Sequence, residues 1–404
     1  MSRLLIAGTL LLVAQVSTPQ CGTTGTPASP TSGSGITVAA TTSNVLPIIV
    51  NGGVNNDSLN EPFTTVTICV PGTSNCQTIS NILVDTGSTG LRVLSSALTL
   101  PLPQQTGAGG APVVECLPFV DSVTWGPVQT ADIKLAGEQA TSIPIQVIGL
   151  DKFPTVPRGC SSQGTPEENQ NDLDANGILG VGPFLQDCGN GCTFTGPSNN
   201  ALYYACPTPA TCVVTTEALA NQVPNPVARF ASDNNGVVLQ FPVVPLGGAP
   251  SVAGVMIFGI GTQSNNALGS AKVFILDSQG NFTTTFNNKA YSQSFIDSGS
   301  NGIFFLDAAT AGLPACKNST DFYCPPTVRA LSAIHTGANG VTSTVAFNAG
   351  NVDAINQTFS AFVETTGSNP GGFDWGLPFF YGRSVFTAFQ GSSTPGGNGP
   401  YWAY

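Results

Sequence analysis

The fold is decided by Ile82-Leu83-Val84-Asp85-Thr86-Gly87-Ser88-Thr89-Gly90-Leu91-Arg92-Val93-Leu94, which returns as Ser294-Phe295-Ile296-Asp297-Ser298-Gly299-Ser300-Asn301-Gly302-Ile303-Phe304-Phe305-Leu306. Both copies have an apolar run, then Asp-Thr/Ser-Gly-Ser-x-Gly, then a second apolar run. The apolar runs are typical of buried strands. Between them we expect a tight turn, because glycine takes positive φ at little cost. One copy would be an ordinary turn, but two copies in matching frames predict one carboxylate on each of two equivalent turns.

The composition indicates a mainly β protein with more than one core. A chain of 404 residues is too long for one small core. Its 47 glycines and 31 prolines separate short apolar runs, and a helix is expected only near residues 216–220 and 226–231. Charged residues make up 8% of the chain and the net charge is −11. We expect no nucleic-acid partner, because binding to nucleic acid calls for a basic patch.

The N-terminus has the pattern of an export signal followed by a linker. Arg3 precedes an apolar run at residues 4–16, which is typical of a signal peptide and too short to span a membrane. We assign residues 1–21 to the signal and residues 22–44, rich in Thr, Ser, Gly and Pro, to a flexible linker. Cys21 is either lipid-modified, which would tether the protein to a membrane, or an unmodified cysteine. The prediction is an exported protein: secreted, periplasmic or anchored to the outer membrane.

The ten remaining cysteines are even in number, which fits an oxidising compartment. They lie in sequence-local pairs, and we predict the disulfides Cys69–Cys76, Cys116–Cys160, Cys188–Cys192, Cys206–Cys212 and Cys316–Cys324. No metal site is expected, since the chain has no Cys-x-x-Cys and a single histidine, His335.

The order of the blocks is the same in both halves, which indicates an internal duplication. Each half has the Asp turn, then hairpin patterns, then an apolar strand with glycine, Pro and Phe, at residues 179–184 and 375–380. In the first half we expect a hairpin with an aromatic residue, Trp125, near its tip. The alternative for Trp125 is an ordinary core aromatic. We place the two β lobes at residues 45–262, with Asp85, and 263–404, with Asp297.

From about residue 44 to the C-terminus these blocks resemble the pepsin-like aspartic peptidases. The resemblance implies a mainly β, bilobal fold whose two Asp turns meet at a pseudo-twofold axis under a long cleft. It implies that Asp85 and Asp297 are the catalytic pair. It implies that the supporting residues of this pair are Thr86, Gly87, Ser88, Ser298, Gly299 and Ser300. Trp125 and Gly126 fall where the family's substrate-binding flap carries Tyr-Gly.

The chain also departs from the pepsin pattern at several positions. The flap aromatic would be Trp125 and not tyrosine, Arg92 replaces an aromatic residue, and Asp374 stands where the second threading strand expects an apolar residue. Between Arg3 and Arg92 there is no Lys or Arg, so no basic prosegment is expected. The blocks Val-Asp-Thr-Gly-Ser-Thr-Gly-Leu-Arg and Trp-Gly-Pro-Val are similar to those of an uncharacterised family of exported bacterial proteins.

Two facing aspartates have a defined chemistry. Carboxylates about 3 Å apart share one proton, and aspartic proteases are the established example. The ionised member can take a proton from water while its partner hydrogen-bonds the scissile carbonyl, so neither metal nor cofactor is required. We therefore predict an exported aspartic endopeptidase that acts as a monomer on a protein or peptide. The alternatives are a non-catalytic protein that binds peptide or glycan in the same cleft, and an exported structural or adhesive protein.

Overall fold

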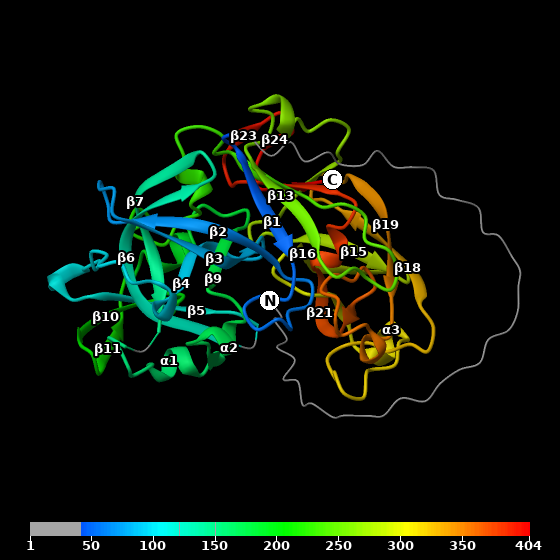
Figure 1. Cartoon of the computed structure of the whole chain (residues 1–404), viewed down its shortest axis with the longest axis horizontal. Helices are drawn as coiled ribbons and strands as arrows, with labels where there is room; N and C mark the ends of the chain where they lie inside the picture. The colour runs from blue at the N-terminus through cyan, green and yellow to red at the C-terminus, as the bar shows by residue number, and fades with distance from the viewer. Residues whose placement is uncertain (1–41, 121, 150) are drawn as a thin grey trace, which may run out of the picture.

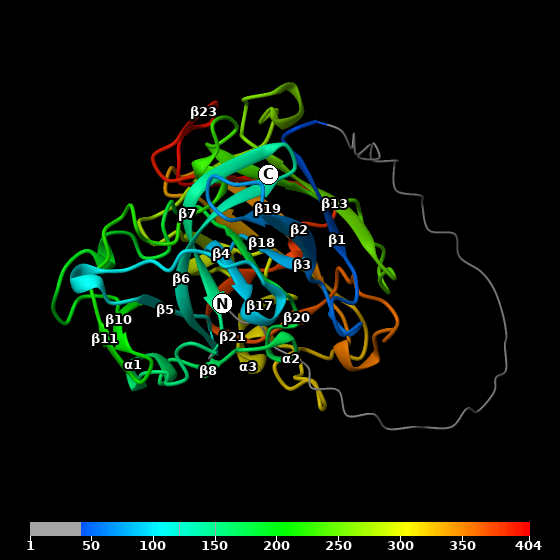
Figure 2. The ribbon, with the colours of Figure 1, turned by 60° about the vertical axis from the view of Figure 1, so that its left-hand side comes forward.

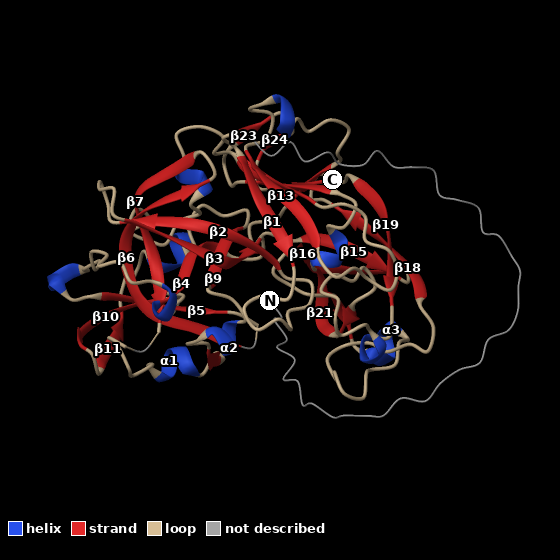
Figure 3. Cartoon of the chain, in the orientation of Figure 1, coloured by secondary structure: helices blue, strands red, loops and turns tan. Residues whose placement is uncertain are grey.

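The structure is a computed structural model that describes residues 42–120, 122–149 and 151–404. The expected signal peptide, Cys21 and all but the last three residues of the linker lie outside the described residues. Figures 1 and 3 show two lobes side by side, in which strands joined by long loops predominate and the helices are short. The prediction of a mainly β protein is confirmed.

The larger sheet extends from the first lobe into the second (Figure 1). In spatial order its strands are β11 (Thr211–Val214), β10 (Tyr203–Thr208), β5 (Val113–Pro118), β6 (Ser122–Leu135), β7 (Glu138–Ile148), β4 (Thr89–Leu94), β9 (Gly177–Val181), β3 (Cys76–Asp85), β2 (Pro62–Cys69), β1 (Val45–Val50), β13 (Val252–Phe258), β12 (Gly236–Gln240), β22 (Ser384–Ala388), β25 (Tyr401–Ala403) and β14 (Val273–Ile275), with β8 (Thr165–Pro166) beside β6.

The smaller sheet belongs to the second lobe. In spatial order its strands are β19 (Thr342–Ala349), β18 (Arg329–Thr336), β15 (Phe282–Phe286), β16 (Lys289–Ile296), β21 (Asn369–Trp375), β17 (Ile303–Leu306) and β20 (Thr366–Gly367). A separate pair is formed by β23 (Ser393–Thr394) and β24 (Gly397–Asn398).

The strand pairings repeat between the lobes, as the duplicated sequence predicts. In the first lobe β9 lies parallel to β3 and antiparallel to β4, and β4 lies parallel to β7. In the second lobe β21 lies parallel to β16 and antiparallel to β17, and β17 lies parallel to β20. In each lobe one strand therefore threads between the strand that enters the Asp turn and the strand that leaves it.

One end of the larger sheet forms a layer that joins the lobes. Its strands, in spatial order, are β1, β13, β12, β22, β25 and β14. The register pairs Val45 with Ile257 and Val238 with Phe386, so early, middle and late parts of the chain share this layer. Figures 1 and 2 both show β1 and β13 running side by side, and Figure 1 shows them between the lobes. The lobe boundary at residues 262 and 263 stays a prediction. The structure assigns β14, β22 and β25, all from beyond that boundary, to the larger sheet.

The helices are all short. The α-helices are α1 (Arg158–Ser161), α2 (Gln170–Leu173) and α3 (Ala308–Ala311), and the 3₁₀ turns are Ser95–Ala97, Ala108–Gly110, Gly189–Cys192, Val227–Arg229, Ser264–Asn266, Val352–Ala354 and Leu377–Phe379. The helix expected at 216–220 is wrong: the backbone N–H of Glu217 bonds to the Cys192 carbonyl, and only a turn follows. The second expected helix shrinks to the turn Val227–Arg229. No helix of the described residues has the length and apolarity of a membrane span.

The five predicted disulfides are confirmed. They join Cys69 to Cys76, Cys116 to Cys160, Cys188 to Cys192, Cys206 to Cys212 and Cys316 to Cys324. Such bonds persist in oxidising compartments, so they are consistent with an exported protein.

Candidate active site

The two Asp turns meet where the lobes join. Asp85 ends β3 and is paired with Gly180 of β9, whereas Asp297 follows β16 and its N–H bonds to the Trp375 carbonyl of β21. Asp85 is 3% exposed and Asp297 is 2% exposed. The apolar strands on either side carry each carboxyl into the interior, and the prediction that the two turns face each other is confirmed.

The two turns are tied together by four reciprocal hydrogen bonds. The Thr86 hydroxyl donates to the Ile296 carbonyl and accepts from Ser298 N–H at 2.9 Å. In the same way the Ser298 hydroxyl donates to the Val84 carbonyl at 2.7 Å and accepts from Thr86 N–H at 3.1 Å. All these groups are buried, where a broken hydrogen bond costs the desolvation of both partners. The expected hydroxyl contacts to the partner turn's backbone are therefore present.

The carboxyl groups themselves are in contact. The N–H of Gly87 lies 2.7 Å from Asp85 Oδ1 and 3.1 Å from Asp297 Oδ1, and the two carboxyls hydrogen-bond each other. Ser88 Oγ bonds Asp85 Oδ2 at 2.5 Å and Ser300 Oγ bonds Asp297 Oδ2 at 2.9 Å, as the motif predicts. We call Asp85 and Asp297 the dyad.

The glycines of the two motifs are needed for space. Neither Gly87 nor Gly299 has positive φ, so the reason given from the sequence is wrong. A Cβ on Gly87 would lie 2.5 Å from Asp297 Cγ, and a Cβ on Gly299 would lie 2.8 Å from Asp85 Cγ. Each glycine thus makes room for the carboxyl of the opposite turn. The sequence could not give this reason, because the close approach involves the other half of the chain.

The dyad favours a bound proton. Burial raises the pKa of Asp297 well above its usual range, and the charges of Asp85 and then Asp374 act in the same direction. A pair of this kind titrates as a unit and holds one proton over a wide pH range. At acid pH it can offer one carboxylate as a base and one carboxyl as a donor.

A cavity of about 300 Å³ borders the first Asp turn and the strand that enters the second. Its walls include Gly87 from the first turn, Phe295 and Ile296 from the strand that enters the second, and Phe184 and Trp402 as aromatic surface. A second, more polar cavity of about 500 Å³ shares Phe184 and Gln279 with the first. Neither cavity is lined by Asp85 or Asp297: the first reaches the Asp85 turn through Thr86 and Gly87, and the second extends from it toward Asp187.

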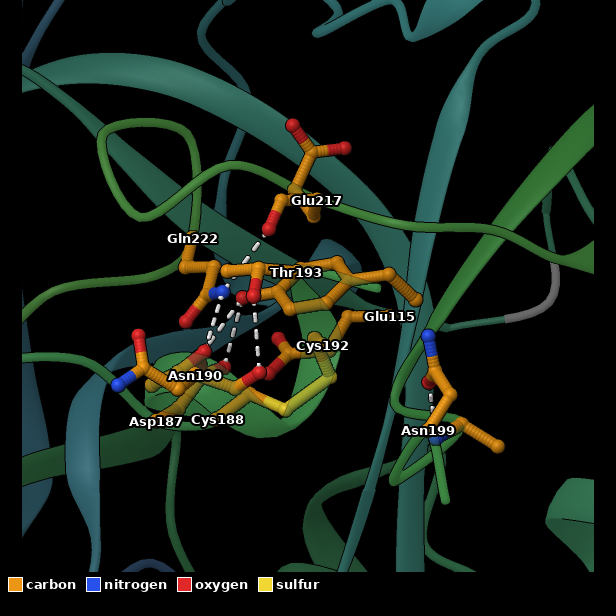
Figure 4. The surroundings of a disulfide bond; sticks show 12 residues. Glu115, Asp187, Cys188, Asn190, Cys192, Thr193, Asn199, Glu217 and Gln222 are labelled. Atoms are coloured by element: carbon orange, nitrogen blue, oxygen red, sulfur yellow. Dashed lines mark hydrogen bonds between the residues drawn. A yellow bond between two sulfur atoms is a disulfide. The ribbon is translucent and has the colours of Figure 1, made fainter. Parts of the chain in front are cut away.

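Arg92 makes a buried ion network that the sequence does not predict. Its guanidinium lies 2.7 Å from Glu115 Oε1 and 3.2 Å from Asp187 Oδ2, and it donates to the Thr89 carbonyl. Tyr203 donates its hydroxyl to Asp187. Figure 4 shows Asp187 directly beside the Cys188–Cys192 disulfide, which closes the adjacent turn. Arg92 thus fixes the strand that leaves the Asp85 turn and does not reach the dyad.

Trp125 and Gly126 do not lie at a hairpin tip. The β5–β6 hairpin turns between Pro118 and Ser122, and Trp125 pairs with Cys116 within the continuous strand β6. Its side chain is fully buried, its indole N–H bonds to the Phe153 carbonyl, and its ring meets Tyr204 edge-on. A Cβ on Gly126 would collide with the Val147 carbonyl of β7. This placement favours the alternative of a core aromatic over a flap residue.

One family matches nearly the whole described chain. It is described as "Protein of unknown function (DUF3443)" and matches residues 40–404. The chain belongs to this DUF3443 family. No curated protein has a sequence that matches the chain. The match agrees with the similarity to an uncharacterised family noted above.

The fold of this DUF3443 protein is pepsin-like. The crystal structure of an aspartic proteinase from Irpex lacteus superimposes with a TM-score of 0.50 and covers 89% of this chain and 96% of its own. The two sequences are 14% identical, so the likeness concerns the fold. The predicted bilobal, internally duplicated pepsin-like fold is confirmed.

Proposed function

We propose that this protein is an exported aspartic endopeptidase, with Asp85 and Asp297 sharing one proton and activating a water molecule. The observation that carries the proposal is the position of the Gly87 N–H, which bonds a carboxyl oxygen of both aspartates. Because the two carboxyls are this close, one is protonated when the other is ionised. The ionised carboxyl would take a proton from water while the protonated carboxyl donates to the peptide carbonyl. Protein or peptide is the substrate class.

The surroundings of the dyad support the proposal. The four reciprocal bonds of Thr86 and Ser298 hold the two turns in one geometry, which the chemistry needs because misplacement by about 1 Å costs catalysis heavily. The cavity beside Gly87 and Phe295 offers space close to the Asp85 turn. The disulfides support export.

The test is a cleavage assay on an unfolded protein substrate. We expect purified protein to cleave it at about pH 3–5, where a shared-proton dyad is half ionised. Asp85→Asn and Asp297→Asn should each lower kcat by roughly 10³-fold, within the range of general acid–base catalysis. Asp132→Asn is the matched control, because Asp132 is also buried but, among the described residues, its carboxyl accepts only the N–H groups of Gly72 and Ser142. Full activity in both dyad variants would refute the proposal.

A second candidate function is the binding of a peptide or glycan without cleavage, with the protein tethered through Cys21 or free. It is favoured by the burial of Trp125. The resemblance implies a flap aromatic at this position that contacts the substrate, and a buried side chain does not do so. A peptide with a secondary hydroxyl in place of the scissile carbonyl separates the two functions. An enzyme should bind this analogue at least about 100-fold more tightly than the unmodified peptide, whereas a simple binding protein should not distinguish them.

A further inference from the structure

A third carboxyl group, that of Asp374, reaches the dyad through Ser300. Ser300 Oγ lies 2.9 Å from Asp297 Oδ2 and 2.6 Å from Asp374 Oδ2. Asp374 stands on β21 opposite Phe295 of β16 and Phe304 of β17. It is therefore held between the strands that enter and leave the Asp297 turn, directly behind the serine of the motif.

The proton count at Ser300 decides which groups are protonated. A hydroxyl carries one proton, so it can donate to one carboxyl group only and must accept from the other. Asp297 already receives the N–H groups of Gly87 and Gly299, which stabilise its ionised form. Asp374 is 1% exposed, and its Oδ1 has no hydrogen-bond partner among the described residues. The proton of the 2.6 Å contact thus belongs to Asp374, and the Ser300 proton points to Asp297.

Burial and the nearby dyad carboxyls favour the neutral form of Asp374 and outweigh the opposite effect of its hydrogen bond with Ser300. The carboxyls of Asp85 and Asp297 are the charged groups that act on it from the two turns. Within the described chain, β17 and β20 carry no titratable side chain, and Lys289 and Tyr291 stand near the opposite end of β16 from the Asp374 pairing. Burial raises the pKa of Asp374 to about 7. At the acid pH of the proposed reaction the group is neutral.

We propose that Asp374 is a positioning residue: as the neutral acid it donates to Ser300 and so holds the Ser300 hydroxyl as a donor to Asp297. The catalytic part of this inference rests on the proposed peptidase function. By donating to Asp297, the chain Asp374–Ser300–Asp297 stabilises the single negative charge that the two dyad carboxyls share once one proton is lost, so the dyad loses its first proton at a lower pH. When Asp374 ionises, the Ser300 proton turns toward Asp374 and Asp297 loses a donor.

Kinetics at varied pH test the positioning role. Asp374→Leu should lower kcat roughly tenfold, the usual effect of one hydrogen bond to a charged group, with a smaller change in KM. The acid limb of the kcat/KM profile should move up by about one pH unit. Asp374→Asn, whose amide can also donate to Ser300, should recover most of both losses. An unmoved acid limb in Asp374→Leu, or an asparagine variant no better than the leucine variant, would overturn the proposal.

The proton on Asp374 can be observed without catalysis. The infrared spectrum of the Asp85→Asn protein at pH 5 is compared with that of the Asp85→Asn/Asp374→Asn protein. The carbonyl band of one protonated carboxyl group should be present in the first spectrum and absent from the second. If the difference spectrum at pH 5 instead contains the bands of an ionised carboxylate, the proton assignment is refuted. If the band is present but the wild-type protein cleaves no peptide, the proton assignment stands and the peptidase function fails.

Discussion

Replacement of Arg92 by methionine would leave two carboxyl groups buried without their cation. Arg92, Glu115 and Asp187 have side chains that are at most 1% exposed. Arg92 also donates to the Thr89 carbonyl at 2.6 Å, directly after the Asp85 turn. Methionine fills a similar volume, so the change removes the charge and its hydrogen bonds with little loss of packing.

The expected cost depends on pH. Removing one partner of a buried ion pair lowers the free energy of unfolding by about 3–5 kcal/mol, and we expect a loss of that size at pH 7. Burial, and next the charge of Glu115, raise the pKa of Asp187 well above its usual range. A carboxyl with a raised folded pKa favours folding below its unfolded pKa and loses that contribution as the pH rises. At pH 4 the Asp187 carboxyl of the variant can take up a proton, so the loss should fall to about 1–2 kcal/mol.

Urea unfolding at both pH values measures this difference. The matched control is Arg158→Met, because Arg158 is exposed on α1 and its loss should cost less than about 0.5 kcal/mol. The added change Asp187→Asn should recover part of the stability of the Arg92 variant at pH 7. An equal loss at pH 4 and pH 7, or a loss below about 1 kcal/mol at pH 7, would refute the reasoning.

Three further predictions concern the dyad and its surroundings. Burial in the folded protein raises the pKa of Asp374 from 3.8 to about 7. This group should therefore make the wild-type protein more stable at pH 4 than at pH 8 by up to about 4 kcal/mol. Asp374→Asn should remove that part of the difference measured by urea unfolding. Thr86→Val leaves the Ser298 N–H buried without its acceptor and should cost about 2–4 kcal/mol, whereas Thr86→Ser keeps the hydroxyl and should cost less than half of this; equal losses in the two variants would contradict the role of the hydroxyl. Trp125→Phe removes the bond to the Phe153 carbonyl and should lower stability by about 1–2 kcal/mol without raising KM for a peptide, since a rise in KM at unchanged stability would mean that Trp125 faces the substrate after all.

The features that a sequence predicts well here are those repeated in it or local to it. The two Asp turns, their apolar strands and the threading strands recur in both halves, so each copy supports the other. The disulfide partners are at most 44 residues apart in the chain and could be paired as neighbours.

The features that the sequence could not place depend on distant contacts. Trp125 is buried because Phe153 and Tyr204 reach it from later segments, and no local pattern distinguishes this from a hairpin tip. Arg92 and Asp187 are 95 residues apart, so their pairing leaves no sequence signal beyond an unexpected charge in an apolar run. Asp374 gave the same signal, a charge where an apolar residue is expected, and its position 74 residues from Ser300 was visible only in three dimensions.

The repeated strand register also locates the equivalent of each unusual residue. Ile178 pairs with Leu83 and Arg92 in the first lobe, as Asp374 pairs with Phe295 and Phe304 in the second. The counterpart of Asp374 is therefore Ile178, and the counterpart of Arg92 is Phe304. Each half thus has one ionisable residue where the other half has an apolar one, and the two places are not equivalent. A backbone whose strand pairings repeat in both halves consequently has an asymmetric electrostatic environment. Under the proposed mechanism the second half tunes the proton of the dyad through Asp374, whereas in the first half Arg92 anchors its own strands.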